Sequence, residues 1–136
     1  MPSMQLLDRF RGCLLGGAVG DALGMPTEGY TAQEIMSRFG PIKEMLPALE
    51  SHFHSGLLAG QFTDDTEETL LLAESLVESC GFSAESFAER LASWGRIWTM
   101  DERLNRGVGF VTRSALEALI AGTAWQQSGL SIPTCG

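Results

Sequence analysis

Apolar residues recur three and four positions apart along most of this 136-residue chain. That spacing is typical of amphipathic helices, because it gathers the apolar side chains on one side of the helix. It predicts helices over four segments: residues 4–24, residues 66–80, a segment beginning after Ser83, and residues 111–121. No segment shows a convincing strand pattern. The sequence therefore predicts an all-α chain that forms a single domain over residues 1–136.

Capping and turn residues separate these helices. Thr31 and Glu34 match a capping box, which predicts a short helix that ends at Gly40-Pro41. Residues 42–61 have no sustained period and are expected to form the longest loop. His52 and His54 lie in this loop, but two histidines without a third ligand nearby do not predict a zinc site.

Glycines and one acid mark the end of the first predicted helix. A row of glycines spaced four apart lies along one side of it: Gly12, Gly16, Gly20 and Gly24. Each interior glycine costs a helix about 0.5–1 kcal/mol relative to alanine, so we expect the row to admit another backbone at close range. Asp21 lies within this glycine-rich turn. A buried, unpaired carboxylate is costly, so Asp21 should have a partner or a metal.

The most distinctive polar segment is Thr63-Asp64-Asp65-Thr66, at the start of the second long helix. Adjacent carboxylates flanked by hydroxyls are the hard oxygen ligands that Mg²⁺ and Mn²⁺ accept. The alternative is that these residues only cap the helix and complement its dipole. The same dipole opposes a cation at this end, so a metal site would need at least two carboxylates. Glu28 follows Pro26 in the loop after the first helix.

These motifs together resemble the ADP-ribosylglycohydrolase family. The matching segments are Gly20-Asp21-Ala22-Leu23-Gly24, then Pro26 and Glu28, then residues 60–67, and finally residues 106–113. The family includes the glycohydrolase that reactivates dinitrogenase reductase, ADP-ribosylarginine and ADP-ribosylserine hydrolases, and J1 crystallins. The resemblance implies a compact orthogonal helical bundle. Family members are longer and carry a second Asp-x-Asp motif that this chain lacks, so we expect the chain to be an N-terminal portion.

The resemblance also implies a site and a reaction. Thr63, Asp64 and Asp65 would supply ligands to a Mg²⁺ or Mn²⁺ centre that is dinuclear in the full-length enzyme, and Glu28 and Asp65 would act in catalysis. Because the second Asp-x-Asp motif completes that centre, the resemblance also implies that this portion by itself is inactive. Asp21, Gly107 and Gly109 would orient other groups or contact substrate. The implied reaction is hydrolysis of an N- or O-glycosidic bond between ADP-ribose and a protein side chain, or in a related small ADP-ribose derivative. Gly107-Val108-Gly109 replaces an Asp-Ile-Gly of the dinitrogenase-reductase-type members, which argues against arginine specificity.

Two other functions stay open. The string from Asp64 to Glu68 is similar to the acidic motif of all-α isoprenoid synthases, in which Mg²⁺ bridges to a substrate diphosphate. That function requires the first acid to lie well inside a helix, so that Asp64 and Glu68 align four residues apart. The chain could also be a crystallin-like or ADP-ribose-binding remnant without turnover.

Charge and cysteine content limit the classes of partner and the cellular compartment that we expect. The net charge is −8 and Lys43 is the single lysine, which argues against a nucleic-acid partner. The apolar run near the N-terminus is too short for a membrane span. Cys13, Cys80 and Cys135 suit a reducing cytosol, the first two as small core residues. We expect a cytoplasmic protein that associates with itself through uncovered apolar helix faces.

Overall fold

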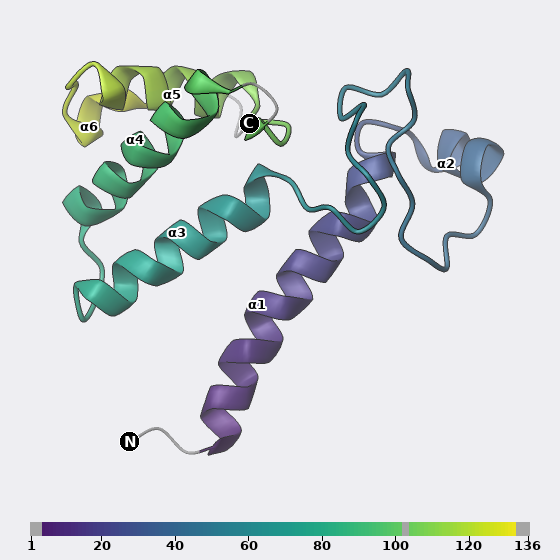
Figure 1. Ribbon diagram of the computed structural model, residues 1–136, viewed down its shortest axis with the longest axis horizontal. Coiled ribbons are helices and arrows are strands. Elements are labelled where there is room, and N and C mark those ends of the chain that lie inside the picture. The colour runs from purple at the N-terminus through teal and green to yellow at the C-terminus, as the bar shows by residue number, and fades with distance from the viewer. Residues whose placement is uncertain (1–3, 102–103, 133–136) are drawn as a thin grey trace. The chain divides into compact units, whose positions relative to one another are not determined.

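A computed structural model describes residues 4–101 and 104–132. The helices are, in order, α1 (Met4–Gly24), the 3₁₀ helix η1 (Met25–Thr27), α2 (Ala32–Phe39), α3 (Asp64–Glu78), α4 (Ala84–Met100), α5 (Phe110–Ile120) and α6 (Trp125–Ser128) (Figure 1). The described residues contain no strand. The all-α prediction is therefore confirmed.

The contacts within the chain divide it into two compact units, Met1–Thr66 and Glu67–Gly136. Unit 1 contains α1, η1, α2, the long loop and the first turn of α3. Unit 2 contains the rest of α3 and the helices that follow. The single domain and the compact bundle expected for residues 1–136 stay predictions.

In unit 1, α1 has the predicted bounds, but it is covered less than the sequence suggested. Phe10 and Leu15 are 60% and 67% exposed. A Cβ built on each glycine of the predicted row meets no atom within 4 Å, so no described backbone packs against this row. Cys13 is exposed and free, not a core residue. Both expectations assumed a neighbour along α1, and the described residues provide none there.

The short helix α2 is built as the capping box predicts. The Thr31 hydroxyl accepts a hydrogen bond from the N–H of Glu34, and the Glu34 carboxylate accepts one from the N–H of Thr31. These bonds satisfy two donors that helix starts otherwise leave free. At the other end Gly40 has a φ of 66°, a left-handed value that favours glycine and stops the helix.

The core of unit 2 lies between α4 and α5. Trp98, Val108 and Leu116 are buried there, and Leu91 and Trp94 pack against them. Leu91, Trp94 and Trp98 of α4 therefore face this core. Gly95 lets α5 come close, because a Cβ at this position would lie 3.3 Å from the Cβ of Leu116.

Helix α3 begins two residues earlier than predicted and also ends two residues earlier, at Glu78. Its end is a turn in which the N–H of Gly81 donates to the carbonyl of Leu76 at 3.0 Å. Cys80 occupies this turn with a φ of 52° and is exposed, which corrects its placement in the core. Cys135 lies outside the described residues.

Ionic contacts connect α3 with α4 in unit 2. Arg90 bridges to Glu74 and Glu78, each at 2.6 Å.

No helix among the described residues is long and apolar enough to cross a membrane.

Candidate functional site

Asp21 joins the end of α1 to the start of α3. Its carboxylate accepts hydrogen bonds from the N–H and the hydroxyl of Thr63, at 2.9 and 2.8 Å. It also accepts bonds from the N–H of Thr66, at 3.2 Å, and from the Thr66 hydroxyl. Both threonines are buried, with 3% and 7% exposure. The cap of α3 is therefore a side chain 42 residues away.

These four bonds define what each group can still do. A carboxylate offers about four acceptor positions, so Asp21 has little capacity left for a cation. Each threonine hydroxyl has turned its proton towards Asp21, which leaves its oxygen lone pairs free to bind a positive ion. Asp21 thus acts on the site by orienting Thr63 and Thr66.

Asp64 and Asp65 begin α3 beside this contact. Asp64 is half-buried and Asp65 is exposed. Burial raises the pKa of Asp64 above its usual range, and the nearby charges of Asp65 and Glu28 raise it further. A hydrogen bond with its own backbone lowers the pKa of Asp64 in part. The excess of negative charge around Asp64 is what a bound cation would relieve.

Glu28 reaches this region from the loop after η1. Its side chain is 58% exposed, and one carboxylate oxygen lies 2.7 Å from Nε2 of His54. The main-chain carbonyl of Glu28 lies 2.8 Å from Nε2 of His52. We call Asp21, Glu28, Thr63, Asp64, Asp65 and Thr66 the acidic site; all six belong to unit 1.

The acidic site has part of a metal-binding set. Among the described residues, no three His, Cys, Asp or Glu side chains gather closely enough to hold an ion by themselves. Mg²⁺ commonly keeps several waters and binds through only one or two protein carboxylates. Asp64, Asp65 and the oriented hydroxyl of Thr63 fit that kind of open site. Their roles as ligands, and those of Glu28 and Asp65 in catalysis, stay predictions.

The segment that contains Gly107 and Gly109 lies in unit 2. Arg106 forms an ion pair with Glu67 at 3.5 Å, and Nε1 of Trp94 donates to Glu67 at 2.8 Å. This segment is therefore anchored to α3 three residues after Asp64. Gly107 has a φ of 94°, which favours glycine. Contact of Gly107 or Gly109 with substrate stays a prediction.

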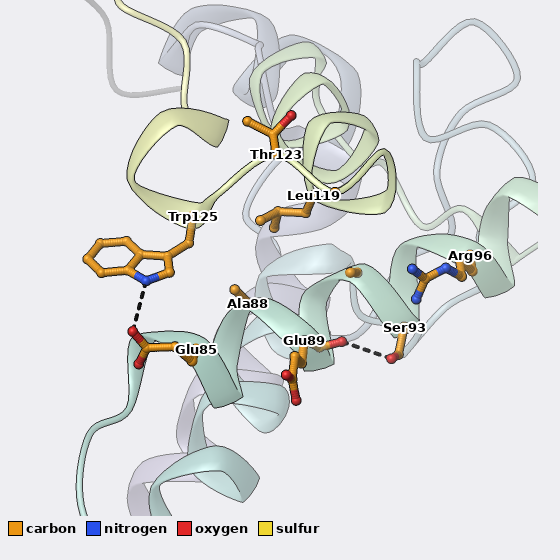
Figure 2. Close-up of a pocket in the computed structure, with 10 residues that line it drawn as sticks. Glu85, Ala88, Glu89, Ser93, Arg96, Leu119, Thr123 and Trp125 are labelled. Atoms are coloured by element: carbon orange, nitrogen blue, oxygen red, sulfur yellow. Dashed lines mark hydrogen bonds between the residues drawn. The ribbon is translucent and has the colours of Figure 1, made fainter.

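Unit 2 also contains a hollow of about 560 Å³, which lies between α4 and the segment from α5 to α6 (Figure 2). Trp125 lies at its edge and donates a hydrogen bond to Glu85 at 3.1 Å. The lining includes Glu89, Ser93 and Arg96 but none of the predicted site residues. This hollow and the acidic site share no residue.

Sequence reasoning did not find three of the residues that shape the acidic site. His52 and His54 were considered only as zinc ligands, yet they hold Glu28. Thr66 was part of the motif but had no role of its own, although it shares Asp21 with Thr63. The only signal in the sequence was that both histidines fall in the one long loop between Glu28 and Thr63.

Comparison with known proteins finds relatives along almost the whole chain. The sequence model of ADP-ribosylglycohydrolase matches residues 2–136. An uncharacterised protein of Archaeoglobus fulgidus is 40% identical over 129 residues, which cover 95% of this chain and 39% of that protein. The ADP-ribosylarginine hydrolase Tri1 of Pseudomonas putida is 35% identical over 127 residues, which cover 90% of this chain and 31% of the hydrolase.

A third relative is the ADP-ribosyl-(dinitrogen reductase) glycohydrolase of Rhodospirillum rubrum. It is 38% identical over 87 residues, which cover 64% of this chain and 28% of that enzyme. This chain thus spans between 28% and 39% of the length of the three relatives.

Proposed function

This chain belongs to the ADP-ribosylglycohydrolase family, and from that premise we propose that its acidic site acts in the metal-dependent hydrolysis of a glycosidic bond of ADP-ribose. The substrate would be an ADP-ribosylated protein or a related small ADP-ribose derivative. Relatives named as ADP-ribosylarginine hydrolase and dinitrogen reductase glycohydrolase support this class of substrate. The expected setting is the cytoplasm.

One observation carries the proposal: Asp21 pins the start of α3 so that Asp64 lies close enough to Glu28 for their charges to interact. Two carboxylates on distant helix ends would not influence each other's charge in this way. Asp64 is also the first residue of α3, whereas an isoprenoid-synthase motif needs its acids inside a helix. The diphosphate-enzyme alternative is therefore not favoured.

The donor set suggests how the residues would share the work. Thr63, Asp64 and Asp65 would supply this portion's ligands to a pair of Mg²⁺ or Mn²⁺ ions in the full-length enzyme. Such ions, when bound, would polarise a water molecule and hold ribose hydroxyls. Glu28 has an exposed carboxylate that can take a proton from the attacking water, and Asp65 is the second exposed carboxylate available for proton transfer. Both would act at an anomeric carbon with oxocarbenium-like character.

Linkage specificity would follow from the sequence of residues 107–109. Gly107-Val108-Gly109 offers no acid to an arginine-linked substrate, although a relative named ADP-ribosylarginine hydrolase is 35% identical. Parallel assays with arginine-linked and serine-linked ADP-ribose would separate the two bond types.

Cation binding and turnover test the proposal together. We expect Mn²⁺ to raise the melting temperature of the chain and to support release of ADP-ribose from a modified protein. The double variant Asp64→Asn with Asp65→Asn should lose both effects, because it lacks the charge that holds the ions. Mn²⁺-dependent stabilisation without release would indicate a binding remnant. Equal release by the parent and the double variant would contradict the proposed site.

A further inference from the structure

Two buried histidines of one loop hold Glu28. His52 and His54 are 5% and 3% exposed. His52 contacts the main-chain carbonyl of Glu28 at 2.8 Å, and His54 contacts its carboxylate at 2.7 Å. One residue is thus held at its backbone and at its functional group. Glu28 itself is an exposed side chain that would otherwise sample many rotamers.

The hydrogen-bond partners indicate which nitrogens carry protons. Nδ1 of His52 accepts the N–H of His54 at 3.2 Å, so the proton of His52 is on Nε2 and is donated to the Glu28 carbonyl. Nδ1 of His54 is buried and has no partner. A buried N–H without an acceptor is rarer than a buried acceptor without a donor. His54 therefore donates from Nε2 to the Glu28 carboxylate.

Packing holds the histidine loop against the turn that carries Glu28. The ring centroids of Tyr30 and His52 lie 5.2 Å apart, and the ring of Phe53 stacks on that of His52 with centroids 4.2 Å apart. Gly29 has a φ of 77°, and a Cβ there would lie 3.2 Å from the ring of Phe53. The segments 28–30 and 52–54 are thus packed in direct contact.

We propose that His52 and His54 are positioning residues that fix the orientation of the Glu28 carboxylate within the acidic site. The catalytic part of this inference rests on the proposed function, because it assigns Glu28 the proton transfer. A hydrogen-bonded partner that is itself buried holds a reactive group in one orientation, as outer partners do for metal ligands. His54 would set the direction of the carboxylate, and His52 would set the position of the backbone that carries it.

Spectroscopy of the free chain tests the contacts of His52 and His54 with Glu28 and needs no enzymatic turnover. In the ¹⁵N-histidine-labelled chain, we expect Nε2 to carry a proton in both rings and Nδ1 of His52 to be unprotonated. Glu28→Gln should shift the nitrogen resonances of His54 and leave Nδ1 of His52 unprotonated. This variant should fold, because the Glu28 side chain is exposed. An Nε2 of His54 that carries no proton, or His54 resonances that do not change in Glu28→Gln, would overturn the inference.

Kinetics separate positioning from mere support of the fold. His54→Phe keeps a ring without a donor, and we expect kcat to fall by roughly 10- to 100-fold with KM nearly unchanged. His54→Gln restores an N–H donor and should recover most of kcat. Ser55→Ala changes an exposed side chain in the same loop and is the matched control. Equal losses in His54→Phe and His54→Gln would contradict positioning. If the parent chain releases no ADP-ribose, the proposed function fails. The histidine spectra alone then decide whether His52 and His54 position Glu28.

Discussion

Asp64 illustrates, at the scale of one residue, the conflict between stability and a charged site. Burial and the charges of Asp65 and Glu28 raise the pKa of Asp64 in the folded chain above its ordinary value of 3.8. At pH values between the ordinary pKa of 3.8 and the raised pKa of the folded chain, the folded state binds more protons than the unfolded state. The free energy of unfolding therefore falls as pH rises through this window. The loss persists at neutral pH. A bound cation would reverse it by compensating the charge.

We therefore predict that Asp64→Asn makes the chain more stable at neutral pH in buffer with a chelator. The gain should shrink in acid, where the Asp64 carboxyl of the parent chain is protonated. Urea unfolding at both pH values measures the effect. Glu50→Gln removes the same charge from an exposed loop position and should change little. A variant less stable than the parent at neutral pH would contradict the cause assigned to the pKa shift.

Asp21 has the opposite role, since its charge is satisfied by four donors. Asp21→Ala removes the cap of α3 and leaves two buried hydroxyls and two N–H groups without their acceptor. We expect it to cost about 2–4 kcal/mol in the free energy of unfolding, from the lost cap and the unpaired donors. Urea titration measures it, with the exposed Asp8→Ala as control. A loss below about 0.5 kcal/mol would mean that water replaces the carboxylate.

At the scale of helices, the close approach of α4 and α5 depends on Gly95. Gly95→Ala would place a Cβ 3.3 Å from the backbone-attached Cβ of Leu116, which cannot move without shifting α5. Overpacking of this kind typically costs about 1–3 kcal/mol, against a gain of up to about 1 kcal/mol in helix propensity. We predict a net loss of about 1 kcal/mol, measured by urea unfolding followed by circular dichroism.

Gly12→Ala is the matched control, because it makes the same change in a helix where no atom lies within 4 Å. It should stabilise α1 by about 0.5–1 kcal/mol. Equal effects at the two positions would show that the α4–α5 contact is looser than its distances indicate.

Helix bounds and capping followed from local sequence. Residues 4–24 and the box at Thr31 and Glu34 depend on neighbours within a few positions, so propensity and pattern were sufficient. The acidic site was only partly predictable. Its residue types stand out at Thr63 to Thr66, but the partners of Asp21 and Glu28 come from residues 24 to 45 positions away. Such contacts leave no periodic signal in a single sequence. The same limit explains the errors along α1, where burial was inferred from a helix face whose neighbour was assumed.

At the scale of the whole molecule, α1 exposes several large apolar side chains of unit 1. Phe10 and Leu14 lie one turn apart and are 60% and 37% exposed. Apolar patches of this kind promote association. We predict that the sedimentation coefficient rises with concentration and that Phe10→Glu with Leu14→Glu abolishes the rise. A parent chain that sediments identically at all concentrations would contradict the prediction.

The long-range cap on α3 has a consequence for how the chain acquires its structure. Asp21 cannot meet Thr66 until the intervening 40-odd residues have closed into a loop, and the entropy of that closure opposes the contact. The first turn of α3 should therefore become ordered late in folding, after the separate helices have formed. In native-state hydrogen exchange, the amide of Thr66 should lose its protection together with that of Thr63, in a single opening event that releases residues 40–63.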